Sequence, residues 1–212
     1  MKASPVVVGV ADHGGWAVLV CAAMADGAPV VIDRRRVPII DPGVPTQPYH
    51  HDTLAMPKAA SEKLVRTVKK SVASCTAAAF DHLSTDLGPR HRIVAIAIRE
   101  PPLPHLPASV KEAHASYNVQ CRADGMLYHA AICADADRRG WDVVRHPRGE
   151  EMERAAVVLG ARPADVGRFL DGLKKTLGPP WSAEHRHVFA AAIARLGDEA
   201  RLRLPLASSP YS

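Results

Sequence analysis

The strongest constraint on the fold is a set of three apolar runs at the start of the chain, separated by two tight turns. The runs cover residues 6–11, 16–24 and 30–40. Gly14 and Gly15 stand between the first two runs, and Asp26 and Gly27 stand between the second and the third. Short apolar runs joined by such turns are typical of antiparallel hairpins. The sequence therefore predicts a three-stranded antiparallel meander.

A fourth strand is indicated by residues 92–99, whose sequence R-I-V-A-I-A-I-R is short, apolar and bounded by charge. Such a run is typical of a strand that is buried on both faces. Residues 58–86 carry apolar side chains at steps of three and four, which predicts a long amphipathic helix before this strand. Because a helical crossover joins parallel strands, we expect residues 92–99 to lie beside residues 6–11 and parallel to them.

The rest of the chain reads as mostly helical. The proline-rich residues 41–57 predict an ordered loop without helix, and Gly140 ends a helix before a short strand. The expected elements are a helix at 109–139 broken near Asp124 and Gly125, a strand at 141–145, and helices at about 150–159, 163–177 and 182–196. The predicted fold is an α/β domain over residues 1–204: a five-stranded mixed sheet with flanking helices, a helical C-terminal third and a tail at 205–212.

Composition restricts the class of protein. The chain has 212 residues and is 47% hydrophobic, which is enough for a substantial core. The formal net charge of +5 weakly favours anionic partners, although arginine-rich usage also reflects a GC-rich genome. Four cysteines lie far apart without a zinc-type pair, which indicates buried thiols in a reducing compartment. With no signal peptide or membrane-length apolar run in view, we expect a soluble cytoplasmic protein.

The element order and the acidic positions resemble the RNase H-like superfamily, and most of all its Holliday-junction-resolvase branch. The resemblance covers roughly residues 5–200. The chain is also similar to bacterial proteins of unassigned function that share the stretches D-x-x-G-W-A, P-Y-H-H and G-P-P-W, found here at residues 12–17, 48–51 and 178–181. The resemblance implies an RNase H-like fold, metal-dependent nuclease activity and a possible homodimer.

Strand geometry predicts where the acidic residues meet. The ends of the first, third and fourth strands share one edge of the predicted sheet. Asp12 ends the first strand, Glu100 follows the fourth, and the loop after the third brings His50, His51 and Asp52. Two-metal phosphoryl transfer needs several oxygen ligands around sites about 3.5–4 Å apart. We expect Asp12, Asp52 and Glu100 to ligate Mg²⁺ or Mn²⁺, with His51 as a catalytic group.

The resemblance implies one more ligand from a late helix, where the superfamily more often has aspartate. Glu184 and His187 are three residues apart and share a helical face, so either is a candidate. Each acid also has a structural explanation. Asp12 suits a turn, Glu100 a solvated strand end, and Glu184 the positive end of a helix dipole. Of the adjacent histidines His50 and His51, at most one faces a shared site.

Basic and aromatic residues suggest how nucleic acid would bind. Arginine forks match phosphates well, although a solvated edge strand and a solvated helix face explain the same charges. The predicted phosphate contacts are Arg34, Arg35, Arg36, Lys63, Arg66, Lys69 and Lys70. Trp16, Trp141 and Trp181 are expected in the core or lining a groove, with base stacking as the alternative.

The sequence-based hypothesis is a Mg²⁺- or Mn²⁺-dependent nuclease that acts on structured DNA or RNA, with Asp12, Glu100, Glu184 and His51 as its catalytic residues. A catalytically silent binding protein of the same fold is the alternative. The turn at Asp12, His13, Gly14 and Gly15 also suits the phosphate-binding hairpin of actin-like ATPases. Those proteins enclose a nucleotide between two such domains, and this chain has room for one.

Overall fold

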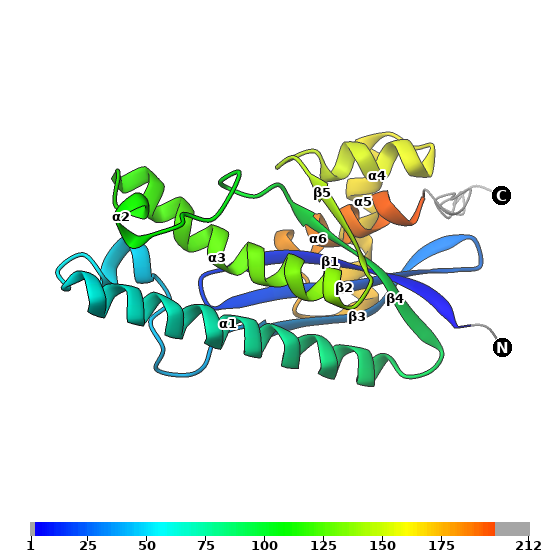
Figure 1. Cartoon of the computed structure of the whole chain (residues 1–212). Helices are drawn as coiled ribbons and strands as arrows, with labels where there is room; N and C mark the ends of the chain where they lie inside the picture. The colour runs from blue at the N-terminus through cyan, green and yellow to red at the C-terminus, as the bar shows by residue number, and fades with distance from the viewer. Residues whose placement is uncertain (1–2, 198–212) are drawn as a thin grey trace, which may run out of the picture.

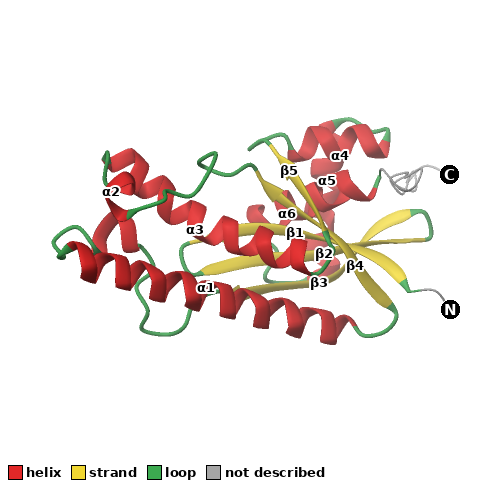
Figure 2. Cartoon of the chain, in the orientation of Figure 1, coloured by secondary structure: helices red, strands yellow, loops and turns green. Residues whose placement is uncertain are grey.

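A computed structural model describes residues 3–197, which form one five-stranded sheet with helices on both faces (Figures 1 and 2). The strand order is β3-β2-β1-β4-β5. β1, β2 and β3 pair antiparallel, whereas β4 pairs parallel with β1 and β5 pairs parallel with β4. The strands are β1 (Ser4–His13), β2 (Trp16–Ala25), β3 (Ala28–Pro38), β4 (His91–Arg99) and β5 (Asp142–His146). The predicted meander and the parallel pairing of residues 92–99 with residues 6–11 are confirmed.

Helices follow the strands in the predicted order, and most bounds differ from the expected ones by one or two residues. One helical element, η1, is a single π-helical turn. The helices are η1 (Pro48–Asp52), α1 (Lys58–Leu87), α2 (Val110–Ala113), α3 (Tyr117–Arg138), α4 (Glu151–Leu159), α5 (Pro163–Leu177) and α6 (Ala183–Leu196).

The sheet separates two hydrophobic clusters. Successive side chains of a strand point to opposite faces, so β1 contributes to both. Val6, Val8 and Val10 pack in the cluster that holds buried residues of α1 and α3. Val7 and Ala11 pack in the cluster that holds α4, α5 and α6 (Figure 1). The parity of a residue in β1 therefore decides which group of helices it meets.

Gly9 lets α6 approach the sheet closely. It lies on the α6 face of β1, and a Cβ atom there would stand 2.0 Å from the carbonyl oxygen of Val188. The close approach brings the helix backbone against the strand, which buries the alanines of α6 against the sheet. Only glycine fits at this position.

Two sequence-based expectations about helices are wrong. Residues 41–57 are not free of helix, because Pro48–Asp52 form η1. The break in the helix at 109–139 falls at residues 114–116 and not at Asp124 and Gly125. The Ser116 hydroxyl accepts a hydrogen bond from the Val119 amide and begins α3 there, while Asp124 is buried within that helix.

Other expectations have mixed outcomes. Cys21 and Cys133 are buried, but Cys75 is half-buried and Cys121 is exposed, so the prediction of four buried thiols is wrong for these two. Within residues 3–197, no helix combines the length and apolar character that crossing a membrane requires. The predicted tail at 205–212 and the domain end at 204 lie outside the described residues.

Candidate functional site

The carboxyl ends of the parallel strands β1 and β4 lie at one edge of the sheet, which we call the carboxyl edge (Figure 2). Asp12 and His13 end β1, and Glu100 follows β4. The chain that leaves β3 runs through residues 39–57, including η1, before α1 begins. Asp12 and Glu100 therefore lie at this edge, His50, His51 and Asp52 lie in η1, and Glu184 and His187 lie at the start of α6.

Asp12 faces α3. It lies two residues after Val10 in β1 and so points to the same face of the sheet, the face that α1 and α3 cover. Its Oδ2 atom lies 4.0 Å from Nδ1 of His129 in α3. The other ring nitrogen of His129, Nε2, lies 3.5 Å from Sγ of Cys133. Burial lowers the pKa of His129, against the attraction of the Asp12 carboxylate, and burial raises the pKa of Cys133.

This aspartate–histidine–cysteine row has the order of a nucleophilic triad but not its access. His129 is 2% exposed and Cys133 is 6% exposed, so a substrate does not reach the thiol. The raised pKa also keeps the thiol protonated, whereas a nucleophilic cysteine needs a lowered one. Asp12 contacts one nitrogen of the His129 ring and Cys133 contacts the other, so these two side chains are not placed to bind one metal ion together. The row is a structural contact between β1 and α3.

Glu184 faces the other side of the sheet. Its Oε1 atom lies 2.5 Å from Nε2 of His13. His13 lies two residues after Ala11 in β1 and so points to the same face of the sheet, the face that α6 covers. Asp12 and Glu184 are thus directed to opposite faces, although Asp12 and His13 are neighbours in β1. The geometry joins Glu184 to a histidine that the sequence-based reasoning did not select.

His13 belongs to a stack of three planar groups. Its ring lies parallel to the indole of Trp16, with centroids 3.8 Å apart and planes at 8°. The guanidinium carbon of Arg36 lies 3.9 Å from the centroid of the same indole. The indole has two faces, and two groups at such distances require one face each. The stack therefore runs from Glu184 through His13 and Trp16 to Arg36.

The η1 turn is held by a buried carboxylate. Asp124 in α3 accepts hydrogen bonds from the amides of Tyr49 (2.9 Å) and His50 (3.1 Å). Burial raises the pKa of Asp124 to about 6, the two backbone bonds oppose the rise, and the negative charge of Asp52 adds to it. His51 is exposed at the surface of this turn, and Asp52 is half-buried. The rings of His50 and His51 contact each other at a centroid distance of 3.9 Å.

The remaining predicted ligands stand apart from these contacts. Glu100 is exposed, and its backbone amide donates to the carbonyl of His146. His187 is half-buried in the first turns of α6. Within the described chain, neither side chain forms a hydrogen bond or an ion pair.

These donors are not gathered around one point in the described chain. A two-metal site needs several carboxylates around one point. Asp12 and Glu184 face opposite sides of the sheet, and Glu184 is hydrogen-bonded to His13. Among residues 3–197, no group of three or more His, Cys, Asp or Glu side chains is arranged to hold an ion.

The three consecutive arginines of β3 have different partners. Arg34 donates to the carbonyls of Leu177 (2.5 Å) and Pro180 (2.9 Å) at the end of α5. Arg35 forms ion pairs with Asp33 and Asp86, both at 2.7 Å. Arg36 is exposed, and its contact is the Trp16 ring. Only Arg36 of the three has a guanidinium that the fold leaves accessible without an acidic partner in the described chain.

The basic residues of α1 form an exposed stripe. Lys63, Arg66 and Lys70 are exposed, and Lys69 is half-buried with its pKa lowered by burial. None of these four cations takes part in an ion pair among residues 3–197. The stripe lies in the N-terminal half of α1, the half that extends past the carboxyl edge of the sheet (Figure 1).

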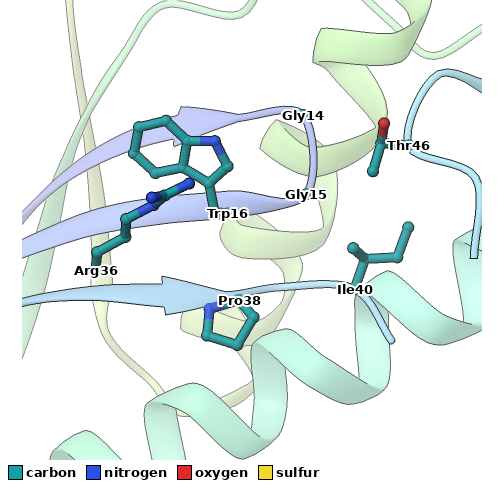
Figure 3. A pocket seen from close by; sticks show the side chains of 7 residues that line it. All are labelled: Gly14, Gly15, Trp16, Arg36, Pro38, Ile40 and Thr46. Carbon is teal, nitrogen blue, oxygen red and sulfur yellow. The ribbon is translucent and has the colours of Figure 1, made fainter. Parts of the chain in front are cut away.

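A pocket of about 430 Å³ opens beside the Trp16 stack (Figure 3). Trp16 and Arg36 stand at one end, Ile40 and Thr46 stand at the other, and the Gly14–Gly15 turn borders it. Gly15 has a φ of +91°, and a Cβ atom there would lie 3.0 Å from Cγ2 of Thr46. Glycine therefore keeps the tight turn and the open space. The sequence predicted Trp16 in the core or lining a groove, and Trp16 lines this pocket.

Comparison with known proteins bears on the fold. The chain matches no protein-family model and no curated protein. It is similar to the solved structure of Thermus thermophilus RuvC, with 14% identity over 91% of this chain and 93% of that chain, at a TM-score of 0.50. T. thermophilus RuvC in complex with a Holliday junction substrate is matched at 13% identity, over 91% and 92% of the two chains, with a TM-score of 0.45. The RNase H-like fold is confirmed.

Proposed function

We propose that this chain of RNase H-like fold binds structured nucleic acid, DNA or RNA, across the carboxyl edge of its sheet, and that it binds without cleaving. The observation that carries the proposal is the exposed stripe of Lys63, Arg66 and Lys70 on α1, which has no acidic partner in the described chain. Exposed cations without acidic partners are the groups that neutralise phosphates and release counterions.

Two further features support a polyanionic partner. The whole chain carries a net charge of +5, so the long-range field attracts nucleic acid. Arg36 adds an exposed guanidinium at the same edge, with its guanidinium carbon 3.9 Å from the centroid of the Trp16 ring. Arginine forks match phosphate oxygens and also stack on planar rings. RuvC has been solved with a Holliday junction substrate, which makes a four-way junction a sensible first probe.

A metal-dependent nuclease is the second candidate, and the likeness of fold to RuvC favours it. In that hypothesis Mg²⁺ or Mn²⁺ is held by Asp12, Asp52, Glu100, Glu184 or His187, and His51 assists. The directions of the side chains do not favour it, because Asp12 contacts α3 while Glu184 is bonded to His13 on the opposite face. We therefore place the nuclease second and derive no reaction step for it.

Binding is tested by fluorescence anisotropy with labelled four-way junctions, duplexes and single strands of DNA and RNA over a range of salt concentrations. The triple variant Lys63→Ala, Arg66→Ala, Lys70→Ala should lower the slope of log K against log salt by about 3, roughly one for each lost phosphate contact. A matched control removes the exposed cations Arg92, Lys174 and Lys175. An unchanged slope in the first variant would contradict the proposed surface. Light scattering on the same samples measures whether the chain forms the homodimer that the sequence left open.

Cleavage is tested on the same substrates with Mg²⁺ or Mn²⁺. We expect no cleavage and no rise in melting temperature with Mn²⁺, because an ion stabilises a protein only when it binds the folded state preferentially. Cleavage that is lost in Asp12→Asn, together with a Mn²⁺-induced rise in melting temperature that is also lost, would establish the nuclease instead.

A further inference from the structure

The pocket beside Trp16 has the dimensions and the lining of a small-molecule subsite. Its volume of about 430 Å³ falls in the range of roughly 300–1,000 Å³ that is usual for ligand pockets. Pro38 and Ile40 provide an apolar wall, and the Gly14–Gly15 turn provides backbone without side chains. Such a wall suits a flat, largely apolar group that approaches the glycine backbone closely.

Arg36 gives the pocket its charge and a flat surface. The guanidinium carbon of Arg36 lies over the indole of Trp16, 3.9 Å from the ring centroid, so the indole covers only one side of the guanidinium. Arg36 is exposed and lines the pocket. No carboxylate in the described chain forms an ion pair with it. Its remaining face and its N–H groups can therefore meet a planar ring or a phosphate.

The stack behind Arg36 holds this surface in place. Trp16 is fixed from its far side by His13, whose ring is parallel to the indole at 3.8 Å. His13 is fixed in turn by Glu184 through the 2.5 Å contact between Nε2 and Oε1. Arg36 therefore lies against a tryptophan ring that His13 and Glu184 already hold in position. A platform ordered in advance reduces the entropy that a ligand loses on binding.

We propose that this pocket takes the base of an unpaired nucleotide, with Arg36 stacking on the base or binding the adjoining phosphate. A nucleotide combines the two properties that the lining selects, a planar ring for the apolar wall and a negative charge for Arg36. The inference rests on the proposed function and deepens it. Bulges and loops contain unpaired bases, so the pocket makes the protein select nucleic acid with such bases over regular duplex.

The test compares a duplex that has one bulged adenine with the same duplex carrying an abasic residue at the bulge. The two probes have equal phosphate charge and differ only in the base. We expect the unmodified protein to bind the adenine bulge at least about fivefold more tightly, the lower end of what one stacked base contributes. If Arg36 stacks on the base, Arg36→Ala should remove this preference, and if it binds the adjoining phosphate, Arg36→Ala should weaken binding of both probes alike. Arg92→Ala, which deletes an exposed arginine at the amino end of β4, should keep the preference.

A second variant adds a side chain at the border of the pocket. At Gly14 an added Cβ atom would meet only the Thr46 carbonyl oxygen, at 3.9 Å, so the first atom of the Gly14→Leu side chain makes an ordinary van der Waals contact. This variant should remove the preference for the base, because the leucine side chain would occupy space that the base needs.

Equal binding of the two probes by the unmodified protein, or a preference that survives both Arg36→Ala and Gly14→Leu, would overturn the inference while leaving the proposed function intact. Failure to bind any nucleic acid would overturn both. Adenosine monophosphate in free solution is the third arm. If it binds as tightly as the bulged strand, the pocket is a free-nucleotide site and the assignment to a strand is wrong.

Discussion

Replacing Asp124 by Asn should change how the stability of this protein depends on pH. Asp124 is 6% exposed and holds the η1 turn through the amides of Tyr49 and His50. Burial raises its pKa to about 6, from an ordinary aspartate value of about 3.9. A rise of this size corresponds to about 3 kcal/mol of differential stability between the protonated and ionised forms.

The sign follows from proton binding. Between about pH 4 and pH 6 the folded protein holds a proton on Asp124 that the unfolded chain has lost. The free energy of unfolding therefore falls as pH rises through this window, and the loss is complete above pH 6. Of the 3 kcal/mol, about 2 kcal/mol is lost between pH 4.5 and pH 7.5. Asn cannot ionise, so Asp124→Asn lacks this contribution.

The variant also loses one contact. Asn has a single carbonyl oxygen, so its amide group must face one of the two backbone N–H donors, and a buried unpaired donor costs about 1–3 kcal/mol. Asp124→Asn should therefore be less stable than the unmodified protein at pH 4.5. The difference should shrink by about 2 kcal/mol, or reverse, at pH 7.5.

Urea unfolding of both proteins at the two pH values measures this directly, since all other titrating groups are common to both and cancel. Asp137→Asn is the control, because Asp137 is an exposed acid on the same helix. Its pH profile should run parallel to that of the unmodified protein. Parallel profiles for Asp124→Asn as well would refute the reasoning that burial controls this carboxyl.

Three other substitutions test the packing and the site. Gly9→Ala places a Cβ atom 2.0 Å from the carbonyl oxygen of Val188 and should lower the free energy of unfolding by about 3 kcal/mol or more, measured by urea denaturation. Arg34→Ala removes the donor to the carbonyls after α5 and should cost about 1–2 kcal/mol, with Arg34→Lys recovering part of it. Glu184→Gln should change stability by less than about 1 kcal/mol, because the pair with His13 is partly exposed. A larger loss would show that Glu184 does more than orient His13.

Local patterns in the sequence were enough for the strands and for most helices. Residues 163–177 were predicted as a helix with the bounds that α5 has, because Pro163 suits a first turn and Gly178 ends the helix. The strand at residues 92–99 was recognisable from its apolar run, and its parallel pairing with β1 followed from the helical crossover. These features depend on interactions between residues that are close in the sequence, which is why the sequence alone reveals them.

The η1 turn depends on a residue far away in the chain. Pro48 and the other prolines around it indicated a loop, and the two amides that begin the turn are satisfied by Asp124, 75 residues from Tyr49. Asp124 itself looked like a helix breaker beside Gly125. Its carboxylate lies within α3 and accepts hydrogen bonds from the η1 turn. No local sequence pattern reveals such a long-range contact.

The site shows the same division between local pattern and tertiary structure. Alternation along β1 already places Asp12 and His13 on opposite faces, and this is a property of the sequence alone. Which helices cover each face is a property of the tertiary structure. Because α3 covers the face of Asp12 and α6 covers the face of His13, the two neighbours have different partners, His129 and Glu184. The sequence determined which acids reach the carboxyl edge, and helix packing decided that Asp12 and Glu184 do not face each other there.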